Sequence, residues 1–271
     1  MGEVRRVLIV GSSTASYSEA GPQSSEYALL ESYLGRARPE TDWRCEAELI
    51  YLTRSMAERT LAAVQERRPD VVVLRLVGGN FFNEYVIERL RQISPLAYRW
   101  SRDVAEWLRR LGGGGPHGLD TPRGWIYRLP RWLMAKTVGT APRIRVEEAI
   151  AVVSATLDGL LQHEDLTTVV RLPSYPKTSD TNLKDYELRV RLFDRSVREY
   201  CERRRVPYYD WAEVRRMAGD ERRIGGDGWH PVLDTRDLDA RSMAAAVLLA
   251  VDGPSEVRLA PSSLEAVGLQ A

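Results

Sequence analysis

The residues Val71–Leu74 form an unbroken apolar run directly after the helix-stopping pair Pro69-Asp70. A run with so little alternation is typical of a strand that is covered on both faces, as in a parallel sheet. Val4–Val10 and Leu166–Leu172 contain similar runs, and segments with helical spacing of apolar residues lie between them. Strands that alternate with helices in this way predict a three-layer α/β/α flavodoxin-like fold with about five parallel strands.

The individual elements follow from the spacing of apolar residues and from the residues that stop helices. Strands are expected at Val4–Val10, Glu48–Leu52, Asp70–Val77, Leu166–Leu172 and Val206–Tyr209. Helices are expected at Glu26–Arg36, Met56–Arg68, Phe82–Ile93, Val146–His163, Leu183–Arg204 and Arg236–Val251. Asp210, which follows the last strand, is expected to cap a helix.

The chain of 271 residues is expected to form a single α/β domain over residues 1–252. A tail with Gly, Pro and Ser follows at 253–271 and is expected to pack loosely. Residues 95–145 interrupt the alternation of strands and helices. They hold four of the seven tryptophans and ten basic residues against three acidic ones. This segment is therefore expected to be a helical insertion in the domain.

Composition and motifs exclude several classes of function. The net charge of +1 gives no overall attraction to nucleic acid or to a membrane surface. Cys45 and Cys201 are the only cysteines, and no His, Asp, Glu or Cys spacing indicates a metal site. No Gly-x-Ser-x-Gly elbow and no phosphate-binding loop is present. We expect a protein without a metal or other cofactor and without a nucleic-acid partner.

The first residues also bear on localisation. Met1–Arg6 lead directly into a strand-like run and lack the long apolar core of a signal peptide. No stretch approaches the roughly 20 consecutive apolar residues of a membrane-spanning helix. A cytoplasmic protein that is not integral to a membrane is therefore expected.

A cluster of hydroxyl side chains follows the first strand and Gly11. It consists of Ser12, Ser13, Thr14 and Ser16. Hydroxyls at this position often cap the next helix, and each could do so here. A serine can instead be a nucleophile when a histidine, oriented by a carboxylate, accepts its proton.

The three histidines differ in their surroundings. His163 ends a predicted helix, where a solvated cation is the ordinary interpretation, and His117 lies in the glycine-rich part of the insertion. His230 lies in the glycine-rich stretch 225–231, three residues after Asp227. The glycines allow this stretch to bend so that Asp227 meets the imidazole, which makes His230 the candidate base.

Three blocks together resemble the SGNH (GDSL-type) hydrolases. Gly11-Ser12-Ser13 resembles the Gly-Asp-Ser block of that family, Gly78-Gly79-Asn80 its Gly-x-Asn block, and Asp227-Gly228-Trp229-His230-Pro231 its Asp-x-x-His block. The order and spacing of the blocks agree with the family over nearly the whole domain. The resemblance implies that Ser13 is the nucleophile, His230 the base and Asp227 the residue that orients it. It also implies that Asn80 and the backbone N–H of Ser13 stabilise the oxyanion.

The sequence departs from this family pattern in three places. Ser12 replaces the usual Asp, and Phe81 follows Asn80 where the family usually has Asp. The glycine of the family's second block has no clear match, and Ser55 aligns best with it. Since a backbone N–H donor does not require glycine, Ser55 is assigned the remaining oxyanion role.

The insertion has two interpretations. Tyr98–Leu111 and Trp125–Met134 are expected to be amphipathic helices on either side of the break Gly112–Gly115. They could form a lid packed on the catalytic face of the sheet. Alternatively, the combination of Trp and Arg could form a surface for an amphiphilic or anionic partner.

Three hypotheses for function follow. The first is hydrolysis of a carboxylic ester, such as an acetylated sugar or another small acyl ester. The second is an acyltransferase that passes the acyl group from the serine to a hydroxyl acceptor. The third is a catalytically silent binding module, which the imperfect second block motivates.

Overall fold

The computed structural model describes residues 3–11, 25–76, 84–100, 103, 137, 141–142, 144–173, 186–217 and 233–253. The chain divides into two compact units. The larger comprises Met1–Gly79, Val146–Thr178 and Leu188–Ala271, and the smaller comprises Asn80–Arg145 with Ser179–Glu187. The limits expected for the insertion and the tail stay a prediction.

The larger unit contains a five-stranded parallel sheet. Its strands are β1 (Glu3–Gly11), β2 (Thr41–Leu49), β3 (Val71–Arg75), β6 (Thr167–Leu172) and β7 (Tyr208–Asp210). They lie in the order β2-β1-β3-β6-β7, and every neighbouring pair is parallel. This is the strand order of flavodoxin-like folds, which confirms the predicted fold class.

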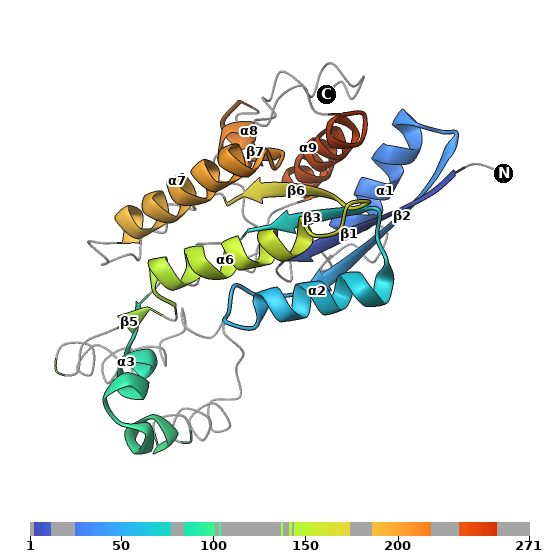
Figure 1. Cartoon of the computed structure of the whole chain (residues 1–271). Helices are drawn as coiled ribbons and strands as arrows, with labels where there is room; N and C mark the ends of the chain where they lie inside the picture. The colour runs from blue at the N-terminus through green and yellow to red at the C-terminus, as the bar shows by residue number, and fades with distance from the viewer. Residues whose placement is uncertain are drawn as a thin grey trace. The chain divides into compact units, whose positions relative to one another are not determined.

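Helices form the two outer layers of this unit (Figure 1). They are α1 (Glu26–Ala37), α2 (Met56–Arg67), α6 (Val146–Leu160), α7 (Tyr186–Arg204), α8 (Trp211–Met217) and α9 (Leu233–Val251). α1 packs against α9 on one face of the sheet, and α2 packs against α6 on the other. None of the helices in the described part of the chain is long and apolar enough to span a membrane.

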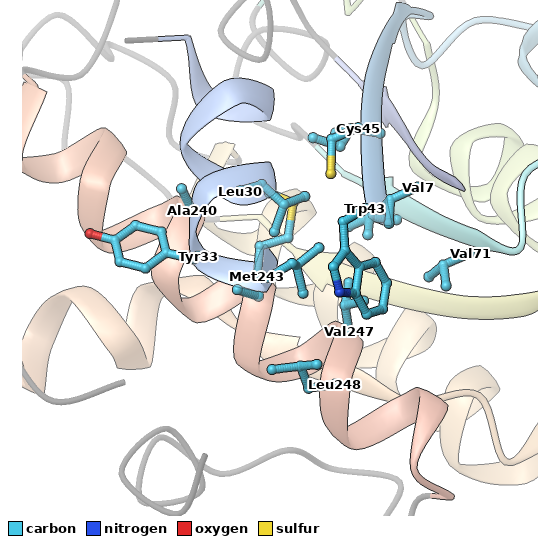
Figure 2. Close-up of a cluster of buried hydrophobic side chains, with 14 residues drawn as sticks. Val7, Leu30, Tyr33, Trp43, Cys45, Val71, Ala240, Met243, Val247 and Leu248 are labelled. Carbon is cyan, nitrogen blue, oxygen red and sulfur yellow. The ribbon is translucent and has the colours of Figure 1, made fainter. Parts of the chain in front are cut away.

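The core between the sheet and the α1/α9 layer explains why the apolar runs become strands. Val7 and Val71 from neighbouring strands belong to one buried cluster with Leu30 of α1 and with Met243 and Val247 of α9 (Figure 2). Alternate residues of the same strands point to the opposite face and are also fully buried. Burying each such side chain contributes about 1.5–3 kcal/mol. The lack of alternation in these runs is therefore the direct consequence of a sheet covered on both faces.

β2 differs from the prediction. It runs from Thr41 to Leu49, whereas the sequence indicated Glu48–Leu52. β2 is an edge strand of the sheet, so its buried residues Trp43 and Cys45 alternate with charged residues that are exposed. This alternation lacks the continuous apolar run by which the central strands were found.

The smaller unit also departs from the prediction at one point. Phe82–Ile93 was expected to be entirely helical, but Glu84–Tyr85 form a short strand, β4, and only Val86–Ile93 form helix α3. β4 pairs antiparallel with β5 (Ala141–Pro142). Residues 95–100 are helical. The rest of the predicted helix Tyr98–Leu111 lies outside the described residues, except for Asp103. The whole of the predicted helix Trp125–Met134 also lies outside them.

Candidate active site

The carboxyl ends of four strands meet at one edge of the sheet. Because the strands are parallel, Val10 is paired with Leu74, Arg75 with Arg171, and Leu172 with Asp210. Ligands of open α/β sheets bind at this edge, in the loops that follow the strands. The segments that contain the first two family-like blocks follow β1 and β3 at this edge, and the third block lies between α8 and α9.

The residues predicted to perform the chemistry lie mostly outside the described part of the chain. Ser13, Asn80, Asp227 and His230 are all in this group. The structure describes the elements that flank them, namely β1, α1, β3, α8 and α9. Ser55 is the one predicted site residue whose surroundings are described. His163, which was set aside as a solvated residue, is indeed exposed.

Ser55 is the N-cap residue of α2. Its hydroxyl lies 3.2 Å from the Thr53 hydroxyl and makes no capping bond, while its carbonyl oxygen accepts a hydrogen bond from Arg59 N at 3.0 Å. Within the described residues, the backbone N–H of Ser55 has no acceptor. The residue is exposed, and a helix N-terminus favours negative charge at this position.

A buried row of polar residues lies one layer below the same edge. Arg75 and Arg171 are paired across β3 and β6, and Tyr209 is paired with Arg171 across β6 and β7. Gly11 continues the row on β1, where a Cβ would lie only 2.9 Å from Arg75 Cβ. The absence of a side chain at Gly11 thus leaves space for the Arg75 side chain.

Two carboxylates from the helices complete this group, which we call the buried ionic cluster (Glu26, Arg75, Arg171, Tyr209 and Asp239). Arg75 Nη1 donates to Glu26 Oε2 at the start of α1, and Arg75 Nη2 donates to Asp239 Oδ2 on α9 at 2.9 Å. Arg171 donates to both oxygens of Asp239, at 2.8 and 2.5 Å. All five side chains are at least 95% buried. The cluster therefore joins β3 and β6 to both α1 and α9.

The two carboxylates have opposite pKa shifts. Burial raises the pKa of Glu26 well above its ordinary value, an effect that Arg75 opposes and Asp239 reinforces. Burial alone would also raise the pKa of Asp239, but the guanidinium groups of Arg171 and Arg75 outweigh it and lower that pKa. Asp239 therefore stays ionised to lower pH than an ordinary aspartate, while Glu26 holds its proton to higher pH than an ordinary glutamate.

The cluster is not fully hydrogen-bonded. Among the described residues, Arg75 Nε and Tyr209 Oη are buried and make no hydrogen bond. Each buried polar group left without a partner costs about 1–3 kcal/mol. Burial raises the pKa of Tyr209 well above its ordinary value, so its hydroxyl remains a neutral donor. The cluster consequently carries a cost in stability at this edge of the sheet.

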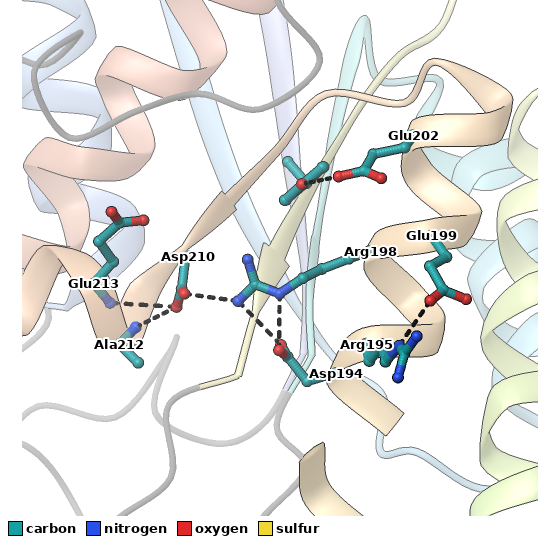
Figure 3. A network of polar contacts seen from close by, with 9 residues as sticks. Asp194, Arg195, Arg198, Glu199, Glu202, Asp210, Ala212 and Glu213 are labelled. Atoms are coloured by element: carbon teal, nitrogen blue, oxygen red, sulfur yellow. Dashed lines mark hydrogen bonds and ion pairs between the residues drawn. The ribbon is translucent and has the colours of Figure 1, made fainter. Parts of the chain in front are cut away.

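A second polar network fixes the end of β7. Arg198 of α7 donates to Asp194 at 2.8 Å and to Asp210 at 2.6 Å (Figure 3). Asp210 Oδ1 in turn accepts hydrogen bonds from the backbone N–H groups of Ala212 and Glu213, at 2.9 and 3.3 Å. These bonds cap α8, which confirms the role predicted for Asp210. α8 leads into the segment that contains Asp227 and His230.

Sequence analysis missed the buried ionic cluster, although a signal for it was present. Arg75 and Arg171 each interrupt an otherwise apolar strand that is covered on both faces. A charged residue at such a position requires an ionic partner, since a lone buried charge is very costly. The partners could not be found from the pattern, because Glu26 and Asp239 lie 49 and 164 positions from Arg75.

The described residues offer no group for a metal ion. Among them, no three His, Cys, Asp or Glu side chains are placed to hold one. Cys45 and Cys201 are both free thiols and both buried.

No protein-family model and no curated protein sequence matches the chain. Solved structures do resemble it. The psychrotrophic esterase EstA from Pseudoalteromonas sp. is 12% identical with a TM-score of 0.54, over 92% of this chain and 100% of that one. The acetyl xylan esterase Axe2 from Geobacillus stearothermophilus is 15% identical with a TM-score of 0.51, over 91% of this chain and 96% of that one.

A third similar structure bears the family's own name. A Parabacteroides merdae protein described as a GDSL-like lipase is 14% identical with a TM-score of 0.50, over 100% of this chain and 98% of that one. These similarities extend over almost the full length of both chains in each pair. The resemblance found in the sequence is thereby confirmed for the fold: the chain has the fold of the SGNH (GDSL-type) hydrolases.

Proposed function

We propose that the chain hydrolyses carboxylic esters of short acyl groups through a serine nucleophile. One observation carries the proposal: the three family-like blocks follow or precede elements that meet at one edge of the sheet. Ser13 comes two residues after β1, Asn80 five residues after β3, and His230 three residues before α9. Asp239 of α9 contacts Arg75, the last residue of β3, so these elements are tied together at that edge.

In the proposed reaction, Ser13 Oγ attacks the ester carbonyl carbon while His230 accepts the serine proton. The alcohol then leaves with that proton as the carbonyl bond reforms, which produces an acyl-serine. Water, deprotonated by His230, releases the acid and restores the hydroxyl. Asp227 keeps the imidazole in the required tautomer and stabilises its charged form.

The tetrahedral oxyanion of each step requires preorganised donors. We assign this role to the Asn80 side-chain amide and to the backbone N–H groups of Ser13 and Ser55. The N–H of Ser55 at the start of α2, which has no acceptor among the described residues, supports its inclusion. The proposed donor of the second block thus comes from a helix N-terminus rather than from a glycine.

The solved structures with this fold support an ester as the substrate. EstA from Pseudoalteromonas sp. is an esterase, and Axe2 is an acetyl xylan esterase. For this chain we propose acetyl or similarly short acyl esters as the substrate class.

The test is hydrolysis of p-nitrophenyl acetate by the wild type and by Ser13→Ala. We expect Ser13→Ala to lower kcat by at least about 10³-fold, because the nucleophile is lost. Ser12→Ala and Ser16→Ala are matched controls for the neighbouring hydroxyls and should stay within about tenfold of the wild type. Ester hydrolysis that survives Ser13→Ala would contradict the proposal.

A fluorophosphonate probe and the time course of nitrophenol release together distinguish the other functions. Covalent labelling of Ser13, located by peptide mass spectrometry, is expected for a serine hydrolase. A burst of nitrophenol with acyl release only after an alcohol is added would identify an acyltransferase instead. A protein that neither labels nor hydrolyses would be a binding module.

A further inference from the structure

Arg75 contacts both ends of the segment that contains Ser13. This segment connects Gly11, the last residue of β1, with Glu26, the first residue of α1. The stem of Arg75 packs against Gly11, where a Cβ would be 2.9 Å from Arg75 Cβ and 3.4 Å from Arg75 Cδ. The guanidinium of the same side chain binds the Glu26 carboxylate. One arginine thus fixes both points at which the segment joins the fold.

Arg75 also reaches the helix that follows His230. Its second guanidinium nitrogen donates to Asp239 of α9 at 2.9 Å, and Arg171 holds Asp239 from the other side with two hydrogen bonds at 2.8 and 2.5 Å. Because a guanidinium is a rigid planar fork, it fixes the direction of each bond as well as its length. α1 and α9 are therefore held in register with the end of β3.

Fold stability alone does not account for such a cluster. Replacing a buried ion pair by apolar side chains of similar volume is often neutral or stabilising. Within the part of the chain that the structure describes, Arg75 Nε and Tyr209 Oη make no hydrogen bond, which adds to the cost. Departures from efficient packing of this kind are expected where function requires a defined geometry.

We propose that Arg75 is a positioning residue, which holds the segment between β1 and α1, and with it Ser13, in the geometry needed for ester hydrolysis. The proposal rests on the function proposed above, but it concerns residues that touch neither the substrate nor the reacting atoms. Gly11, Glu26 and Asp239 are its contacts, and Arg171 keeps Asp239 in place.

The central experiment compares Arg75→Met with Arg241→Met. Met keeps much of the apolar stem and removes the guanidinium, and Arg171 still pairs with Asp239. Arg241 is a matched control on α9, since it binds Asp237 at 2.7 Å and lies over the Tyr33 ring of α1. We expect Arg75→Met to lower kcat for p-nitrophenyl acetate by about 10- to 100-fold with KM changed less than about twofold. Arg241→Met should leave kcat within about twofold.

A conservative variant tests whether a loss of activity in Arg75→Met merely reflects misfolding. Arg75→Lys keeps the positive charge but not the planar fork, so its kcat should lie between those of the wild type and Arg75→Met. Thermal unfolding of each variant shows how much of any loss is global. An equal loss of kcat in Arg75→Met and Arg241→Met at equal thermal stability would overturn the positioning role.

Hydrogen exchange separates this proposal from the proposed function. Amide exchange in peptides covering residues 12–25 should accelerate in Arg75→Met and not in Arg241→Met. Unchanged exchange in Arg75→Met would overturn the proposal even if the protein is an esterase. If ester hydrolysis survives Ser13→Ala, the proposed function fails, and exchange in residues 12–25 alone decides whether Arg75 holds the segment.

Discussion

Arg75 lies across Gly11, so that a Cβ built on Gly11 would be 2.9 Å from Arg75 Cβ and 3.2 Å from the Arg75 carbonyl oxygen. Both atoms belong to the neighbouring strand and cannot move far without disturbing the sheet. Gly11→Ala should therefore destabilise the fold by about 1–3 kcal/mol through overpacking. Urea denaturation measures this change.

Gly35 provides the contrast. It lies within α1, and a Cβ built there meets nothing within 4 Å. Gly35→Ala should stabilise the fold by about 0.5–1 kcal/mol, because Ala loses less backbone entropy in a helix. Equal effects of the two substitutions would contradict the close approach of Arg75 to Gly11.

The raised pKa of Glu26 predicts a pH-dependent stability. The folded state binds the Glu26 proton more tightly than the unfolded state, so the contribution of Glu26 is fully present below its unfolded pKa. It is lost as the pH rises through the raised, folded pKa. Glu26→Gln imitates the protonated form and cannot titrate. As the pH rises above the ordinary pKa of a glutamate, the wild type should therefore lose stability relative to Glu26→Gln.

Denaturation by urea at a series of pH values measures this difference. Asp239, whose pKa is lowered, contributes in the opposite direction: its stabilisation is present above its unfolded pKa and is lost as the pH falls through the folded value. The two residues thus titrate in separate pH ranges. If the difference in unfolding free energy between the wild type and Glu26→Gln stays constant with pH, the raised pKa of Glu26 is refuted.

The backbone N–H of Ser55 can be tested by a pair of variants. Ser55→Ala keeps the N–H and removes a hydroxyl that makes no capping bond, so kcat should change little. Ser55→Pro removes the N–H itself, and the loss of one oxyanion donor should lower kcat by about 10²–10³-fold. The φ of Ser55 is −87°, about 20° from the value that proline takes, so a small local adjustment accommodates the ring. Equal kcat values in the two variants would remove Ser55 from the proposed oxyanion hole.

Both thiols should be unreactive in the folded protein. Burial, with a contribution from Glu31, raises the pKa of Cys45 well above its ordinary value. Burial and Glu202 raise the pKa of Cys201 to about 12. Since the thiolate is the reactive form, iodoacetamide at neutral pH should modify neither residue until urea is added. Mass spectrometry of the intact protein reports the number of alkylated thiols, and rapid labelling of the native state would contradict the burial.

The central strands were predictable because their apolar character is continuous. Val71–Leu74 must be buried on both faces, and that requirement already implies helices above and below the sheet. The prediction misplaced β2 because an edge strand is only partly buried. Its apolar residues alternate with charged ones and form no continuous apolar run. β4 was missed because Glu84–Tyr85 is a strand only through its pairing with β5, more than fifty positions away. Local periodicity carries no information about that pairing.

The same distinction applies to the candidate site. The blocks around Ser13, Asn80 and His230 could be found because each is local and contiguous in sequence. The buried ionic cluster joins residues that are distant in sequence, and its charges belong to types that are ordinarily exposed. The role of Ser55 and the nature of any partner of the Trp- and Arg-rich insertion remain predictions from sequence.

The charged edge strand has a consequence for how the protein behaves at high concentration. In the described part of the chain, β2 pairs with β1 alone, and the exposed side chains of Asp42, Arg44 and Glu46 are spaced along this edge strand. A strand from another molecule that added there would have to remove water from these charges. Natural sheets use such residues to prevent edge-to-edge aggregation. The feature that concealed β2 from sequence analysis is thus one that helps to keep the sheet from growing into larger assemblies.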